Sequence, residues 1–390
     1  MAAERSLYAK ENRRPGQPRR ATGIDPTFCV MVLALLTVGL LMLYSASSAQ
    51  SQYDTGYESS TRYFQKQGIC ALLGLAAMWL MSRVPAKLWM KLAWPLYGIS
   101  IALLLSVLLF GQSVNGARRW INIAGIRFQP SEIAKFAMIV LLARLTRLFG
   151  SHSADFRHGV LGFGAAMLGL LVPLALEKHL SAIMLMGMVG VCMMFVAGTG
   201  KRWLLAGAAA AGVFVIIYIT FMGYAGDRVS AWLHPEQDPG DTGYQILQSL
   251  YAIGSGGLFG LGLGKSRQKY LYLPFQYNDY IFAVICEELG LVGALLIIVL
   301  FCAMLLRGYW IALRAADRFS TVLAAGLVTL IAVQTALNLG VITNLLPSTG
   351  IALPFFSYGG TALAMNLAEI GVILSVSRQR NLSKDQEDLI

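Results

Sequence analysis

Long apolar stretches separated by short polar segments make up most of the chain after residue 25. A helix needs about 20 mostly apolar residues to cross a bilayer, and the pattern contains ten such runs. They cover approximately 26–48, 67–82, 92–110, 132–148, 158–176, 180–198, 203–222, 280–306, 320–340 and 355–376. The pattern therefore predicts an all-α integral membrane protein with ten transmembrane helices, formed by residues 26–377.

The connection between the predicted seventh and eighth helices, residues 223–280, is far longer than a connection needs to be. Ile246, Leu250 and Ile253 have helical spacing and predict a short helix over 244–253 that lies on the bundle. The glycines of 254–264 predict tight turns where the loop folds back on the membrane. They do not indicate a nucleotide site, because no strand precedes them and phosphate-loop spacing is not met.

Composition agrees with this class, since 56% of the residues are hydrophobic and 13% are charged, against about 25% charged in soluble domains. The net charge of +11 does not indicate nucleic-acid binding, because the basic residues occupy short inter-helix segments without an aromatic platform. All five cysteines fall inside apolar runs without metal-ligand spacing, so we interpret them as small buried hydrophobic residues.

Lys and Arg fix the expected orientation. Placing the N-terminus in the cytoplasm gives the inner segments twice as many Lys and Arg as the outer ones. Residues 1–25 then form a basic cytoplasmic tail, 378–390 a cytoplasmic C-terminal tail, and 223–280 a large extracellular loop. The first apolar run is a full span, so we expect it to be retained as an anchor.

Residues 115–136, between the predicted third and fourth helices, carry cations on the outer face, where the orientation rule would deplete them. Arg118, Arg119 and Arg127 are suited to bidentate phosphate binding. Trp120 fits either the interfacial aromatic belt or a stacking face for a sugar.

Glu132 and Lys135 are three residues apart and share one helix face, where they can neutralise each other. Two interpretations stay open, a buried ion pair that fixes packing and a site for an anionic head group. Pro130 indicates a helix start, with Ser131 as the N-cap. The charged turn of residues 176–181 is interpreted as solvated.

Asp279 stands where the long loop meets the predicted eighth helix, and a carboxylate in such a place is a functional-site hypothesis. Arg267 and Lys269 add cations to the same face. Glu287 lies roughly 12 Å further along the helix and is too distant to form a dyad with Asp279. Residues 344–362 mix Pro and Gly with apolar residues and predict broken backbone that lines a cavity or is buried.

Four segments together resemble the SEDS family (shape, elongation, division and sporulation), in its FtsW/SpoVE branch rather than RodA. They read YSASS at 44–48, NGARRWI with QPSEIAK at 115–135, GYQILQSLYAIGSGGLFGLGLGKSRQKYLYLP with DYIFAVICEELG at 243–290, and NLG with PSTGIALPFFSYGG at 338–360. The spellings NGARRW and SRQK before YLP favour that branch.

The resemblance implies ten membrane helices and a peptidoglycan glycosyltransferase that uses lipid II on the outer face of the bacterial cytoplasmic membrane at the division septum. Lipid II and the nascent glycan strand would be its substrates, and a class B penicillin-binding protein and other divisome membrane proteins its partners. The family's catalytic aspartate falls on Asp279. The neighbourhood departs from the family pattern, with Phe275 for Glu, Asn278 for Thr, Tyr280 for Phe and Asn344 for Gly.

On this basis Asp279 is the predicted general base. The predicted substrate-binding residues are Arg118, Arg119, Trp120, Glu132 and Lys135, with Arg267 and Lys269 as alternates for the pyrophosphate. The sequence offers no dedicated metal cage, and a divalent cation, magnesium or manganese, is left open. A transporter that flips lipid II is the alternative, and a scaffold that recruits a synthase is a third interpretation.

Overall fold

The computed structural model describes residues 23–114, 117–123, 126–207, 209, 223–237 and 242–379. Its longer helices are α2 (Pro26–Asp54), α3 (Arg62–Met81), α4 (Ala86–Phe110), α5 (Pro130–Phe149), α6 (Phe163–Leu176), α7 (Leu180–Val196), α11 (Ile281–Leu313), α12 (Arg318–Ile342) and α13 (Gly360–Ser377). The shorter elements are β1 (Gln112–Val114), β2 (Ala117–Ile123), β3 (Ile126–Phe128), η1 (Gly150–Ala154), η2 (Phe156–Gly162), α9 (Gly223–Leu233), η3 (Pro235–Gln237) and α10 (Thr242–Gly256).

The prediction of a helical membrane protein is confirmed in its coarse form. Among the described residues, seven helices are long and apolar enough to cross a membrane, counting η2 and α6 as one, and α7 is a shorter apolar helix. Of the predicted run at 203–222, only residues 203–207 and 209 are described. The count of ten therefore stays a prediction.

Helix starts follow ordinary capping chemistry. Asp25 caps α2 by accepting a 3.0 Å hydrogen bond from the backbone N–H of Phe28, and Pro26 occupies the first turn, where no amide donor is needed. Pro130 starts α5 as predicted. The prediction of Ser131 as its N-cap is wrong, because Gln129 occupies that position. The proline, which is favoured at the first helical position, sets the N-cap two residues earlier than predicted.

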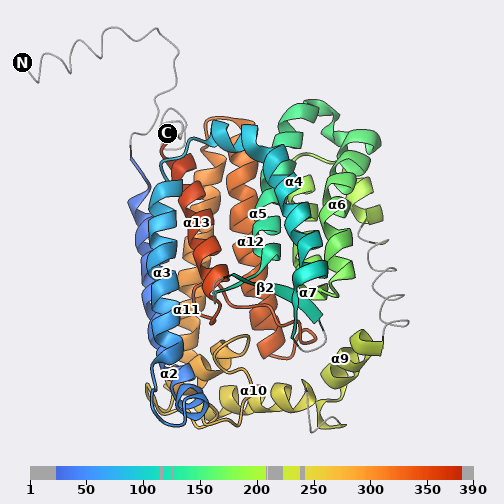
Figure 1. Ribbon diagram of the computed structural model, residues 1–390. Coiled ribbons are helices and arrows are strands. Elements are labelled where there is room, and N and C mark those ends of the chain that lie inside the picture. Colours follow the sequence, from blue (N-terminus) through green and yellow to red (C-terminus); the bar gives the residue numbers. More distant parts are fainter. Residues whose placement is uncertain are drawn as a thin grey trace, which may run out of the picture.

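Three helices form the centre of the bundle. α5, α12 and α13 lie in the middle, α2 and α3 on one side, and α4 and α6 on the other (Figure 1). Nearly every side chain of α5 is buried, as expected for a helix that other helices surround.

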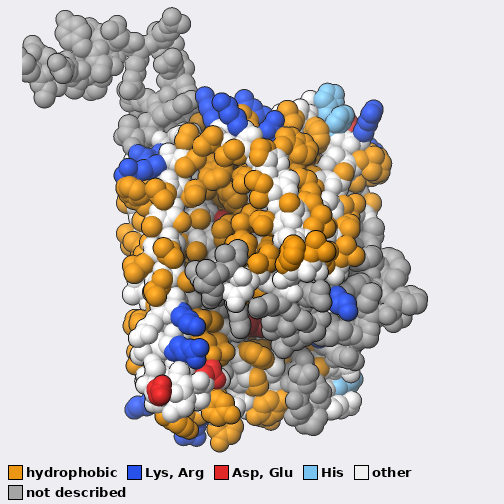
Figure 2. All heavy atoms as spheres, viewed as in Figure 1, with side chains coloured by type: hydrophobic (Ala, Val, Ile, Leu, Met, Phe, Trp, Pro, Cys, Tyr) orange, Lys and Arg blue, Asp and Glu red, His pale blue; other side chains and the backbone are white. Residues whose placement is uncertain are grey.

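The two ends of the bundle differ in charge. Where α2 begins and α13 ends, here called the terminus end, the backbone N–H of Asp25 donates to Ser377 Oγ at 3.1 Å. Figure 2 shows Lys and Arg side chains along this rim and a hydrophobic band below it. The opposite end, here called the loop end, carries α9 and α10, which cross beneath the bundle (Figure 1).

A small sheet modifies the all-α prediction. β1, β2 and β3 form a three-stranded antiparallel sheet in that order, with Gln112 opposite Trp120 and Ile121 opposite Phe128. Aromatic and β-branched residues favour such strands. β1 and β3 have three residues each and are too short to give a sequence signal, whereas the seven-residue β2 was missed.

A break in α11 explains the glycine-rich loop. Gly290 is non-helical, with φ 68°, and the chain from Gly257 to Gly262 pairs with the interrupted backbone on both sides. Leu261 N donates to Glu287 O at 2.9 Å, and Leu291 N donates to Gly257 O at 2.9 Å. A Cβ on Gly290 would lie 2.3 Å from Gly260 N, so the two segments approach too closely for a side chain. The predicted turns are confirmed for residues 257–264, whereas Gly254 and Gly256 lie in α10. The pairing satisfies polar groups that a helix break exposes.

The predicted helix over 244–253 is confirmed as α10. Its buried face is formed by Ile246, Ser249 and Ala252, and Ser249 Oγ donates to Ile342 O of α12 at 3.0 Å. The predicted face shifts slightly, because Leu250 and Ile253 are only half-buried.

Candidate active site

Asp279 lies between the long loop and the first turn of α11, and α12 holds its backbone. Asn338 Nδ2 donates to Asp279 O at 2.7 Å and to Ile351 O at 2.8 Å. One buried amide of α12 therefore joins Asp279 to the segment of residues 343–359, here called the re-entrant segment.

The two residues before Asp279 are held in the same way. Tyr358 N donates to Tyr277 O at 2.8 Å, and Ser357 Oγ donates to Asn278 O at 2.6 Å. Three successive carbonyl groups, from 277 to 279, thus accept hydrogen bonds from α12 and the re-entrant segment. These bonds fix the backbone that carries the predicted base.

The Asp279 carboxylate faces the re-entrant segment. A Cβ on Gly350 would lie 3.3 Å from Asp279 Oδ2. Burial raises the pKa of Asp279 to about 6, although Asp279's own backbone and the nearby Arg228 act in the opposite direction. The carboxylate is mostly ionised at neutral pH and still basic enough to take a proton.

Arg228 of α9 approaches from the loop end. Its Nη1 donates to Ser348 O at 2.9 Å, and its neighbour Trp232 donates from Nε1 to Asn344 O at 3.0 Å. Asn344 has φ 56°, a left-handed conformation that Asn tolerates better than most residues other than Gly. The departure from Gly at this position is therefore structurally compatible, and the predicted broken backbone is confirmed.

The turn between α6 and α7 forms another wall, and its interpretation as solvated charge is wrong. Glu177 is 3% exposed and His179 is 7% exposed. Arg119 Nη2 of β2 donates to Lys178 O at 2.6 Å, and Gln129 Nε2 lies 3.4 Å from His179 Nε2. The turn is buried because β2 and the start of α5 cover it.

This turn also contacts the re-entrant segment, since Ser181 Oγ donates to Thr349 O. Thr349 precedes Gly350, the residue that faces Asp279. The contacts from Arg119 through the α6–α7 turn to Asp279 are therefore continuous.

Burial changes the charge state of the turn. It raises the pKa of Glu177 to about 8, and the Arg119 charge opposes this rise. Burial lowers the pKa of His179 to about 3, with Arg119 and Lys135 acting in the same direction. At neutral pH both side chains are mostly uncharged, so they do not neutralise the cations beside them.

Glu132 and Lys135 form the predicted ion pair, 2.8 Å long, with both side chains buried in α5. Glu369 of α13 is also buried and interacts electrostatically with both. The pair is confirmed, and its role in substrate binding stays a prediction.

Several buried polar atoms around Asp279 lack a hydrogen-bond partner within the described part of the chain. They are Glu177 Oε1, His179 Nδ1, Asn278 Oδ1, Asn338 Oδ1, Asn344 Oδ1 and Thr349 Oγ1. Most buried polar atoms are paired in native proteins. Other unpaired buried atoms occur elsewhere in the described chain, and these six leave hydrogen-bonding capacity for a polar ligand on the α6–α7 turn, on α12 and on the segments next to Asp279.

The structure places the predicted substrate residues in different surroundings. Arg119 and Lys135 belong to the walls described above, and Trp120 is half-buried in β2. Arg118 and Arg127 lie in β2 and β3, and their side chains are outside the described atoms. Arg267 is exposed, whereas Lys269 is buried against Glu288.

Sequence reasoning missed Arg228, Glu177, His179 and Asn338. A signal was available for Asn338, because a polar amide within an apolar run indicates a buried partner. No group of three or more His, Cys, Asp or Glu that could hold a metal ion occurs among residues the structure describes.

The sequence model of the cell cycle protein family of FtsW, RodA and SpoVE matches residues 26–382. The chain belongs to this family. Within it, the chain is FtsW/SpoVE-like, as its motifs indicate. It is 38% identical to the probable peptidoglycan glycosyltransferase FtsW of Geobacter metallireducens, over 90% of this chain and 94% of the relative.

Other relatives are equally similar. The chain is 38% identical to stage V sporulation protein E of Bacillus subtilis, over 92% of this chain and 98% of the relative. It is 37% identical to the peptidoglycan glycosyltransferase MrdB of Escherichia coli, over 92% of this chain and 95% of the relative.

Solved structures of the family share the fold. A chain of a peptidoglycan synthase complex, solved to show the structural coordination of polymerization and crosslinking, matches with a TM-score of 0.78 and 29% identity, covering 92% of this chain and 98% of that one. The rod shape determining protein RodA of Thermus thermophilus matches with a TM-score of 0.68 and 28% identity. The match covers 92% of this chain and 97% of that one.

Proposed function

We propose that this chain is a peptidoglycan glycosyltransferase that polymerises lipid II into glycan strands on the outer face of the cytoplasmic membrane. The observation that carries the proposal is the setting of Asp279, whose backbone is fixed at three successive carbonyls and whose pKa is raised to about 6 by burial. Such a group suits general base catalysis near neutral pH. The names of the relatives support the same activity.

In the proposed reaction, the 4-hydroxyl oxygen of the acceptor sugar attacks the anomeric carbon of the donor. Asp279 takes the hydroxyl proton as the new carbon–oxygen bond forms. The bond between the anomeric carbon and the pyrophosphate oxygen breaks, and undecaprenyl pyrophosphate leaves with the electron pair. Direct displacement inverts the anomeric centre from α to β.

The leaving pyrophosphate requires positive charge. Arg119 and Lys135, with Arg118 beside them in the sequence, are the proposed cations, and Arg228 adds one on the side of Asp279. The uncharged states of Glu177 and His179 support this assignment, because neither group would repel an anion or cancel the cations. Glu132 would orient Lys135, and Trp120 would contact a sugar.

A divalent cation remains part of the proposal without a dedicated protein site. The described residues bring no three His, Cys, Asp or Glu together, so a magnesium or manganese ion would be held mainly by pyrophosphate oxygens. It would supply charge neutralisation at the leaving group.

The proposed placement follows the charge pattern. Ten helices would cross the membrane with both termini in the cytoplasm, and the loop end would face outward. The Lys and Arg rim at the terminus end (Figure 2) supports this orientation.

Septal or spore cortex synthesis is proposed, with a class B penicillin-binding protein, the nascent strand and other divisome proteins as partners. The related peptidoglycan synthase complex, in which polymerization and crosslinking are coordinated, is consistent with such a partner.

Lipid II polymerisation by the purified chain in detergent tests the function, with and without the cognate penicillin-binding protein. We expect glycan polymer that increases when the partner is present. A lipid II transporter or a recruiting scaffold would give no polymer from this chain in either condition. That result would replace the proposal with one of those alternatives.

A further inference from the structure

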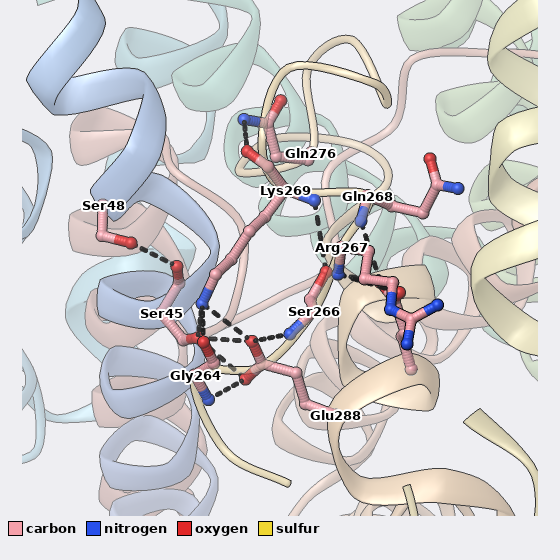
Figure 3. A network of polar contacts seen from close by, with 10 residues as sticks. Ser45, Ser48, Gly264, Ser266, Arg267, Gln268, Lys269, Gln276 and Glu288 are labelled. Atoms are coloured by element: carbon pink, nitrogen blue, oxygen red, sulfur yellow. Dashed lines mark hydrogen bonds and ion pairs between the residues drawn. The ribbon is translucent and has the colours of Figure 1, made fainter. Parts of the chain in front are cut away.

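A second buried polar cluster lies at the loop end, next to the chain that leads to Asp279 (Figure 3). At its centre is the carboxylate of Glu288, which is 1% exposed. It accepts hydrogen bonds from Ser45 Oγ of α2 at 2.7 Å, Gly264 N at 3.0 Å and Ser266 N at 3.2 Å, and pairs with Lys269 Nζ at 3.1 Å. Both carboxylate oxygens are fully engaged.

The preceding residue, Glu287, binds the same loop. It accepts from Ser266 Oγ, from Arg267 N at 2.9 Å and from Gln268 N at 3.3 Å. Successive backbone N–H groups form an anion-binding concavity, and here the two carboxylates of the chain fill it. The loop from Gly264 to Gln268 is thus bound to α11.

Lys269 has no donor to offer a substrate. A Lys ammonium has three N–H donors, and its Nζ contacts three oxygens, Ser45 Oγ at 3.2 Å, Gly264 O at 2.6 Å and Glu288 Oε1 at 3.1 Å. The side chain is also almost fully buried. These contacts give Lys269 a different role from the predicted pyrophosphate contact.

The ion pair encloses the chain that contains Asp279. Lys269 lies before Asp279 in the loop and Glu288 lies after it in α11, so their contact closes the intervening chain into a ring. Inside the ring, Gln276 Nε2 donates to Lys269 O at 3.2 Å, and Asn278 N donates to Phe275 O at 2.9 Å. The first turns of α11 form the other half of the ring.

We propose that the buried Lys269–Glu288 pair is a positioning device that fixes the Asp279 ring against α2 and thereby orients the general base. The inference rests on the proposed function of Asp279. A misplacement of about 1 Å in a reacting group reduces rate by about 10²-fold. Opening the ring should therefore lower kcat, and KM for lipid II should stay nearly constant because Lys269 does not contact substrate.

Lys269→Met in the full-length chain tests the proposal, assayed for lipid II polymerisation with the partner present. We expect kcat per folded molecule to fall by about 10-fold to 10²-fold, with KM changed by less than about 3-fold. The acidic limb of the pH profile should also move, because Asp279 would lie in a different environment.

Arg307→Met is the matched control. It breaks another ion pair with a fully buried carboxylate, Arg307–Asp25 at 2.8 Å, in which Arg307 is half-buried, at the terminus end and far from Asp279. We expect a lower melting temperature and an unchanged kcat for the folded protein. Equal loss of kcat in both variants would show a merely structural role and overturn the proposal.

Two other results would also overturn the proposal. An unchanged kcat in Lys269→Met excludes positioning, and a raised KM with unchanged kcat would show substrate binding.

If Lys269→Met does not fold, Ser45→Ala decides the question, because it removes only the hydroxyl that joins α2 to the pair. A lower kcat at constant KM in that variant supports positioning, and a wild-type kcat contradicts it. Failure of the proposed function is distinct, since it would appear as activity in Asp279→Asn.

Discussion

Two buried polar clusters differ in how completely their atoms are paired. One surrounds the Lys269–Glu288 pair, and the other lies on the segments that contact Asp279, just before α11. In the Lys269–Glu288 cluster, every ammonium proton and both carboxylate oxygens of the pair have partners. Around Asp279, buried atoms of Glu177, His179 and Asn338 have none within the described residues. Gln268 Oε1 and Gln276 Oε1, beside the ion pair, also lack a partner within the described residues, so the contrast holds for the pair itself. A fully paired ion pair rigidifies the fold, whereas unpaired buried atoms have capacity left for a ligand.

The comparison also separates the cations of the outer face. A sequence shows only that Arg119, Lys135, Arg267 and Lys269 are positively charged. The structure shows that Lys269 is fully engaged by its own chain. Arg119 stands beside Glu177 and His179, which are mostly uncharged at neutral pH because burial shifts their pKa values. Proximity to Asp279 in the sequence is therefore a poor guide to which cation meets the substrate.

Among Arg119, Arg228 and Glu177, the substitution Arg119→Met should produce the largest loss of kcat. Removing one preorganised donor to a charged transition state reduces kcat by about 10² to 10³-fold. Steady-state polymerisation measures this, with Arg267→Met as the control. Arg267 is exposed and contacts Glu287 through its backbone, so we expect near wild-type rates. Equal losses in the two variants would contradict the division between clusters.

Asp279→Asn should stabilise the fold at neutral pH. Burial raises the native pKa of Asp279 from 3.8 to about 6, so the native state favours the protonated form and loses stability as pH rises from about 4 to 6. The uncharged amide avoids this loss, worth up to about 3 kcal/mol at pH 7. Thermal unfolding at pH 4 and pH 7 checks it. A variant that is less stable than wild type at pH 7 would refute the burial argument.

Arg228→Gln should change the pH dependence and reduce kcat/KM at pH 6. The Arg228 charge lowers the pKa of Asp279, so its removal raises that pKa and moves the acidic limb of the profile above pH 6. The loss should be smaller at pH 8, where Asp279 is ionised in both proteins. A limb that stays in place or moves to lower pH would show that Arg228 does not act on Asp279.

Glu177→Gln should have the smallest effect, within about 3-fold of wild type at pH 7, since a carboxyl with pKa about 8 is mostly protonated there and Gln resembles it. Glu177→Ala is the control for lost packing. If Glu177→Gln alone abolished polymerisation, the ionised form would be required, and the charge states assigned to the α6–α7 turn would be incorrect.

Sequence reasoning predicted the parts of the fold that depend on local pattern. Apolar runs predicted the helices, Pro130 the start of α5, and the glycines the turns of the long loop. The break at Gly290 was not predictable, because it depends on pairing with Gly257–Gly262, a distant part of the chain. The three-residue strands β1 and β3 were too short to detect, and the seven-residue β2 was missed.

For the candidate site too, residue type and spacing could be predicted from the sequence, whereas burial and partners could not. Residue type and spacing predicted the Glu132–Lys135 pair, which the structure confirms. They also singled out Asp279, whose catalytic role stays a prediction. The burial of Glu177 and His179 follows from coverage by β2 and α5, which no local pattern encodes. Lys269 was assigned to substrate because its partner, Glu288, lies on another element and is recognisable only in three dimensions.

The central claim is that Asp279 is the general base of lipid II polymerisation. Polymer formation by purified wild type and Asp279→Asn, with the same partner and equal amounts of folded protein, tests it most directly. The account predicts a loss of about 10² to 10⁴-fold in kcat for the variant together with an undiminished melting temperature. Polymerisation by Asp279→Asn at the wild-type rate would contradict it.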